Sequence, residues 1–124
     1  MPVFLAVAAG GALGSLSRYA VDRLIERRVA SVFPWSTFTI NVTGCFLAGV
    51  VVAALVDRHD APAWIRTGAV VGFLGAYTTF STFAQESRDL LVGGHLSLAL
   101  ADTVGSVVVG VLAVVAGSGV GRML

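Results

Sequence analysis

The chain of 124 residues is 56% hydrophobic and 12% charged, and its net charge is only +1. Soluble domains carry about 25% charged residues, and a chain this short has too little interior to hide so much apolar surface from water. The composition therefore excludes an ordinary soluble domain, and the small net charge provides no basic field for binding nucleic acid. The sequence predicts an all-α membrane protein in a lipid bilayer, with residues 1–124 forming a single transmembrane domain.

Four stretches of the sequence are long and apolar enough to cross a membrane. A spanning helix needs roughly 20 mainly apolar residues. The stretches are residues 3–21, 36–56, 63–86 and 96–120. Because their number is even, both ends of the chain are expected on the same side of the membrane.

The arginines are divided almost evenly between the two sides, and the sequence has no lysine. Arg58, Arg66 and Arg122 fall on the side of the termini, and the other side has Arg18, Arg23, Arg27, Arg28 and Arg88. An excess of positive residues normally marks the cytoplasmic side. Three against five is a weak bias, so the sequence predicts insertion in both orientations; a fixed orientation would put the termini outside.

Small residues recur four positions apart along the predicted helices. Examples are Gly10 and Gly14, Gly68 and Gly72, and Gly117 and Gly121. In lipid this spacing lets the backbones of neighbouring helices approach closely. Four closely packed helices enclose too little volume for an aqueous path, so a transport route would require a dimer.

Two ionisable residues lie inside predicted spans, where charges are costly and usually functional. Arg18 is about one turn inside the end of the first span, and Asp102 is six residues into the fourth. They enter the membrane from the same side, so a structural ion pair between them is one hypothesis. The alternative for Arg18 is a side chain that extends to the lipid headgroups. A bare carboxylate would repel anions, so Asp102 is not expected to line an anion path.

Asn41 lies five residues inside the second span. A single asparagine in a span either joins two helices by hydrogen bonds or donates its amide hydrogens to a ligand. Its spacing alone does not separate these two roles.

Residues 72–83 of the third span favour a break in the helix. The segment contains two glycines, three threonines and a serine. Broken backbone at membrane depth is tolerated only where it is buried in protein or lines a cavity, although the hydroxyls could also bond back to their own helix. Phe80 and Phe83 share one face here, and the electropositive ring edges could hold a small anion beside Asn41, Ser81 and Thr82.

Three stretches of this sequence closely resemble the Fluc/CrcB family of fluoride channels. They are residues 10–19, with Gly-Gly-Ala-Leu-Gly and Arg18-Tyr19, residues 37–44 around Asn41, and residues 75–83. The last ends in Thr-Thr-Phe-Ser-Thr-Phe, which is the most specific of the three. With chain length and span number included, the resemblance covers essentially the whole sequence.

The resemblance implies an antiparallel, dual-topology dimer of two four-helix subunits, each with a broken third helix. Two fluoride pores and one central structural sodium ion (Na+) belong to this arrangement. The family pattern assigns the fluoride pathway to Asn41, Phe80, Ser81, Thr82, Phe83 and, with a looser match, Ser106. It assigns sodium binding to the backbone carbonyls of Gly75 and Thr78. Ala76 and Tyr77 depart from the family pattern, where glycine and a smaller residue are usual, so the break could be stiffer here.

The function implied is passive exit of fluoride through the plasma membrane, by a homodimer or by a heterodimer with a paralogous subunit. No nucleotide motif, metal-ligand cluster or catalytic dyad points to an enzyme. A proton-coupled multidrug transporter would need an acid in the membrane interior, and only Asp102 could serve. A structural membrane protein without conduction would not require Asn41, the threonines and the phenylalanine pair together.

Overall fold

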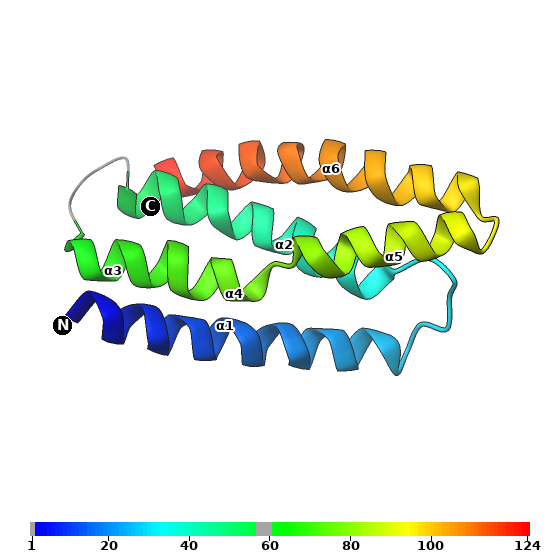
Figure 1. The fold of residues 1–124 in the computed structure, drawn as a ribbon. Helices are drawn as coiled ribbons and strands as arrows, with labels where there is room; N and C mark the ends of the chain where they lie inside the picture. The colour runs from blue at the N-terminus through cyan, green and yellow to red at the C-terminus, as the bar shows by residue number, and fades with distance from the viewer. Residues whose placement is uncertain (1, 57–60) are drawn as a thin grey trace.

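The computed structural model describes residues 2–56 and 61–124, and this part of the chain is helical without strands. Arg58, counted above for orientation, lies outside the described residues. The elements in chain order are α1 (Pro2–Glu26), α2 (Trp35–Val51), η1 (Val52–Val56), α3 (Ala63–Thr67), η2 (Gly68–Leu74), α4 (Gly75–Tyr77), α5 (Phe80–Val92) and α6 (Leu96–Met123). The segments η1 and η2 are π-helical. Figure 1 shows the long helices lying side by side along one common direction, with both termini toward the same end of the bundle.

Helices occupy all four predicted stretches, but their ends differ from the prediction. The first helix continues past residue 21 to Glu26, and α5 continues past residue 86 to Val92. Three helical units, Pro2–Glu26, Trp35–Val56 and Leu96–Met123, are long and apolar enough to cross a membrane. The third predicted span is divided among α3, η2, α4 and α5, so a fourth crossing stays a prediction.

Glycines bring the helices of two pairs into backbone contact, as the small-residue spacing predicted. On α1, a Cβ atom at Gly10 would overlap the Gly68 carbonyl oxygen, and one at Gly14 would overlap the Phe73 carbonyl oxygen. On α6, a Cβ atom at Gly117 would overlap the Phe46 carbonyl oxygen of α2. Thus α1 packs closely on η2, and α6 packs closely on α2.

The buried core is thin, and one side of α6 is apolar and uncovered. Ile40 and Ala99 are each 2% exposed, whereas Val107, Leu112 and Val115 on α6 are more than 60% exposed. A protein in water would bury such side chains. This face therefore suits lipid or another protein surface.

Candidate functional site

The predicted break in the third helical stretch occurs at Thr78 and Thr79, which have extended backbone between α4 and α5 (Figure 1). The Thr78 N–H donates to the Leu74 carbonyl at 3.1 Å and ends α4. Thr79 begins α5, because its hydroxyl oxygen accepts from the Thr82 N–H at 3.3 Å. The same hydroxyl donates to Thr82 Oγ1 at 2.9 Å. The hydrogen of the Thr82 hydroxyl therefore stays available for another acceptor.

Asn41 binds the backbone of this break through both ends of its amide. The Thr79 N–H donates to Asn41 Oδ1 at 2.9 Å, and Asn41 Nδ2 donates to the Thr79 carbonyl at 3.0 Å. Since Thr79 N–H is used in this way, it does not bond the Gly75 carbonyl four residues earlier. Asn41 thus joins α2 to the break, as one of its two predicted roles requires. Its second amide hydrogen is not used in these bonds.

Tyr77 fixes the other side of the break. Thr43 donates its hydroxyl hydrogen to the Thr39 carbonyl at 2.7 Å, so the Tyr77 hydroxyl acts as donor in the 2.8 Å contact with Thr43 Oγ1. The Tyr77 ring also stacks on Phe73, with centroids 5.8 Å apart and planes 7° apart. Tyr77, which departs from the family pattern, therefore anchors α4 to α2. This contact was not anticipated from the sequence.

A cavity of about 380 Å³ lies beside the break, between α1, α2 and α5. Its wall is formed by Ser15, Arg18, Tyr19, Asp22, Ile40, Thr79, Ser81 and Thr82. The structure therefore brings Arg18 together with two of the predicted pathway residues, Ser81 and Thr82. The positive end of the α5 helix dipole adds to the guanidinium charge. A positive charge, hydroxyl donors and a helix N-terminus together suit a small anion. The Asp22 carboxylate in the same wall adds a negative charge, and it accepts a hydrogen bond from Ser36.

The predicted ion pair between Arg18 and Asp102 is not formed. Asp102 is 0% exposed, and its carboxylate accepts hydrogen bonds from Ser87 at 2.8 Å and from Ser106 at 3.4 Å. Ser106, expected to extend the polar lining, therefore has its hydroxyl beside Asp102 and is not part of the cavity wall. The Ser87 contact was missed from the sequence, although burying a carboxylate is costly unless a hydrogen-bond donor compensates it.

Phe80 and Phe83 lie together on α5, as their spacing predicts. Their ring centroids are 5.7 Å apart, with an angle of 47° between the planes. Phe80 is 79% exposed, and Phe83 is half-buried. Neither ring forms the wall of the Arg18 cavity. The Phe80 ring therefore faces outward from the single chain, with the half-buried Phe83 ring beside it.

Glu86 is a further polar residue that the sequence analysis treated only as the boundary of the third span. It lies one turn after Phe83, in the wall of a second cavity of about 370 Å³ that also includes Asp22, Asp89 and His95. Its Oε2 atom is buried and has no hydrogen-bond partner among the described residues. Asp22, which accepts a short hydrogen bond from Ser36, belongs to the walls of both cavities.

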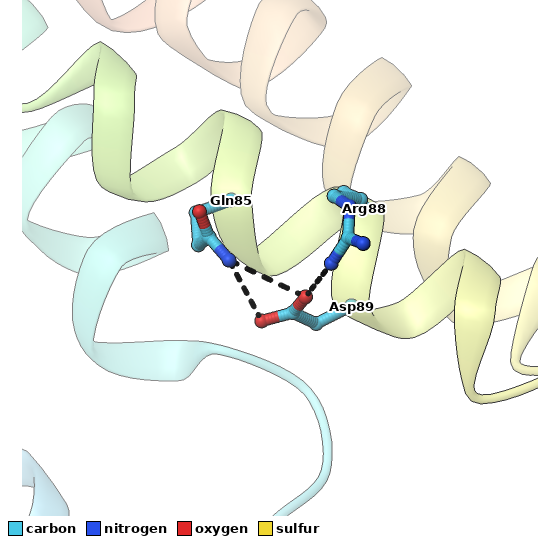
Figure 2. Close-up of polar contacts among 3 residues, drawn as sticks. All are labelled: Gln85, Arg88 and Asp89. Atoms are coloured by element: carbon cyan, nitrogen blue, oxygen red, sulfur yellow. Dashed lines mark hydrogen bonds and ion pairs between the residues drawn. The ribbon is translucent and has the colours of Figure 1, made fainter.

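Gln85, Arg88 and Asp89 form an exposed polar cluster on α5, and Asp89 also belongs to the wall of the second cavity (Figure 2). Arg88 Nη1 lies 3.0 Å from Asp89 Oδ1, and the Gln85 amide lies 3.5 Å from both Asp89 oxygens. The Arg88 and Asp89 side chains are 67% and 56% exposed. We expect Arg88→Ala to change the free energy of unfolding by less than about 0.5 kcal/mol, because exposed ion pairs contribute little. Equilibrium unfolding in detergent tests this, and a loss above 2 kcal/mol would contradict it.

These features define a small helical membrane protein whose polar groups gather at a helix break. Its sequence matches the family model described as "CrcB-like protein, Camphor Resistance (CrcB)" over residues 5–118. The chain belongs to this family. With its long apolar helices, it is a multi-pass protein of the plasma membrane.

Curated relatives extend over nearly the whole chain. A protein of Acidobacterium capsulatum named fluoride-specific ion channel FluC is 45% identical over 98% of this chain and 97% of its own length. Its namesake in Maridesulfovibrio salexigens is 37% identical over 100% of this chain and 98% of its own. A third relative of the same name, in Saccharophagus degradans, is 46% identical over 91% of this chain and 84% of its own length.

Proposed function

We propose that this chain is one subunit of a fluoride-selective ion channel through which fluoride leaves the cytoplasm passively, which protects the cell from fluoride. The observation that carries the proposal is the full-length similarity to relatives named fluoride-specific ion channels. The family is one of ion channels and not of enzymes.

The polar groups around the break support this function because fluoride must lose its water to cross a membrane. Arg18, Ser81 and Thr82 lie around one cavity, and the unused amide hydrogen of Asn41 is close to the same break. These groups can replace water as hydrogen-bond donors. Conduction requires sites strong enough for the ion to enter and weak enough for it to leave, and several modest donors meet both conditions.

The outward-facing Phe80 ring supports a dimeric channel. Ring edges are electropositive, so the edges of Phe80 and Phe83 can contact an anion without a full positive charge. With Phe80 79% exposed, a second subunit would be needed to close a path over these rings. The apolar face of α6 offers further surface for lipid or for that subunit. We propose an antiparallel, dual-topology dimer, either of two copies or of this chain with a paralogue.

A structural sodium ion fits the backbone at the break. Sodium is bound in membrane proteins by backbone carbonyl oxygens where a helix is unwound. The Gly75 carbonyl is released from the Thr79 N–H, and Gly75 is exposed on the surface of the chain. Gly75 and Thr78 would offer their carbonyls, and two subunits would double the number. Bound there, sodium would supply a positive charge that ties the two breaks together.

No energy coupling is required for fluoride to leave. A potential that is negative inside drives an anion outward by about 2.3 kcal/mol per 100 mV. The rival transporter would use Asp102 for proton exchange, but this acid is enclosed by protein and bonded to two hydroxyls.

The test is fluoride efflux from liposomes that contain the purified chain alone, with chloride efflux as the control for selectivity. We expect fast fluoride efflux, reduced about tenfold or more by Phe80→Ile, which removes one ring edge worth more than about 1 kcal/mol. Phe4→Ile is the matched control, since Phe4 is also 79% exposed. Absence of efflux would indicate a missing paralogous partner, and continued absence after co-expression with that paralogue would reject the channel.

A further inference from the structure

The buried carboxylate of Asp102 connects α5 to α6. It is 0% exposed and accepts from Ser87 of α5 at 2.8 Å and from Ser106 of α6 at 3.4 Å. A buried carboxylate is tolerated when hydrogen bonds replace its water. The shorter bond, from Ser87, is therefore the contact that Asp102 depends on most.

The hairpin formed by α5 and α6 sets the height of this contact relative to the ring pair. A tight turn with Gly94 at φ 80° joins the two helices, and the His95 N–H donates to the Leu90 carbonyl at 2.8 Å. In such a hairpin, residues equally distant from the turn lie at the same level. Three such pairs follow from the turn outward: Leu90 with Ala99, Ser87 with Asp102, and Phe83 with Ser106.

Ser87 is therefore one helical turn from Phe83, about 6 Å along α5. Residues four apart lie on the same face of a helix. Leu90 and Ala99, one turn nearer the loop, are 5% and 2% exposed, so the hairpin is closely packed there. One turn farther from the loop than Ser87, the residue on the same face of α5 is the half-buried Phe83. The Ser87–Asp102 bond is thus the polar contact between α5 and α6 that lies beside the rings.

We propose that Asp102 is a positioning residue for the ring pair. By accepting the Ser87 hydroxyl, its carboxylate fixes the rotation of α5 about its own axis and so the direction in which the Phe80 and Phe83 edges point. By accepting from Ser106, it also holds the Ser106 hydrogen away from any anion. The effect of this clamp on fluoride rests on the proposed function, whereas its effect on ring orientation does not.

The test compares fluoride efflux for Ser87→Ala, Asp102→Ala and the double variant. Ser87→Thr keeps a hydroxyl and should restore efflux. Thr103→Val is the matched control, because the Thr103 hydroxyl donates to the Ala99 carbonyl of its own helix at 2.8 Å. We expect each single variant to lower the efflux rate about tenfold, as for loss of one hydrogen bond to a charged group, and the double variant to lose no more. The clamp would be contradicted if the variants lowered stability without lowering efflux, and if the effects of the two single variants added in the double variant.

A second readout does not depend on conduction. 4-Fluorophenylalanine at position 83 reports the ring environment by ¹⁹F NMR, and the same label at position 73 is the control, because Phe73 stacks on Tyr77 away from the clamp. We expect Ser87→Ala to move the resonance at 83 but not that at 73. Unchanged resonance at 83, or a moved resonance with wild-type efflux, would overturn the proposal. If the chain shows no efflux before mutation, and still none after co-expression with a paralogue, a moved resonance would support the clamp while the channel is rejected. Because Ser87→Ala is a mild change, failure of Asp102→Ala to fold leaves this test intact.

Discussion

Asn41→Ala is expected to lower fluoride efflux about a hundredfold or more and to destabilise the fold by about 2–5 kcal/mol. The substitution removes both hydrogen bonds to Thr79 at once. Thr79 is only 8% exposed, so its N–H and carbonyl would be left unpaired away from water. The freed N–H could then return to the Gly75 carbonyl and close the break. Efflux would fall because the extended segment and its polar groups would lose their positions.

Thr39→Val is the matched control on the same helix, because it removes a polar group at nearly constant side-chain volume and leaves both bonds between Asn41 and Thr79 in place. Asn41→Asp separates the two roles of Asn41, since a carboxylate still accepts from Thr79 N–H but cannot donate to the Thr79 carbonyl or to fluoride. Liposome efflux and equilibrium unfolding in detergent measure both effects. Wild-type stability of Asn41→Ala would show that its backbone bonds do not hold the break.

The positions of the helices could be predicted from apolar run length, but their ends could not. Hydropathy finds the part of a helix that suits lipid. The first helix continues to Glu26 through polar residues, where Arg23 and Glu26 form an ion pair three residues apart at 3.3 Å. Helical backbone persists there because intrahelical bonds do not require apolar side chains. The interior of each stretch was thus predictable, and the polar margin was not.

The break was also predictable, because glycine and threonine at the centre of a span are poor helix formers. The partners of the polar residues were not predictable. Arg18 and Asp102 were placed at one height from their distance to the span ends, but height does not give the direction around a helix. Arg18 lies beside Ser81 and Thr82 at the start of α5, whereas Asp102 bonds Ser87 farther along that helix, so the two residues face different parts of α5. Asn41 and Thr79, which do meet, are 38 positions apart in sequence.

Gly117→Ala is expected to destabilise the protein by at least about 3 kcal/mol, the upper part of the range for overpacking. The added Cβ atom would overlap the Phe46 carbonyl oxygen and lie 2.9 Å from the Phe46 carbonyl carbon. These are backbone atoms of α2, so no side chain can rotate away. The helices α2 and α6 would have to separate, and the neighbouring close contacts at Gly49 and Gly121 would open with them.

Gly119→Ala provides the matched control two residues away, because nothing lies within 4 Å of a Cβ atom at Gly119. Alanine is a better helix former than glycine by about 1 kcal/mol, so this variant should equal or exceed the wild type in stability. The same chemical change on the same helix is therefore expected to have opposite signs at the two positions. Equilibrium unfolding of both variants in detergent measures the difference. If both variants unfolded like the wild type, close backbone contact would not be what holds α6 against α2.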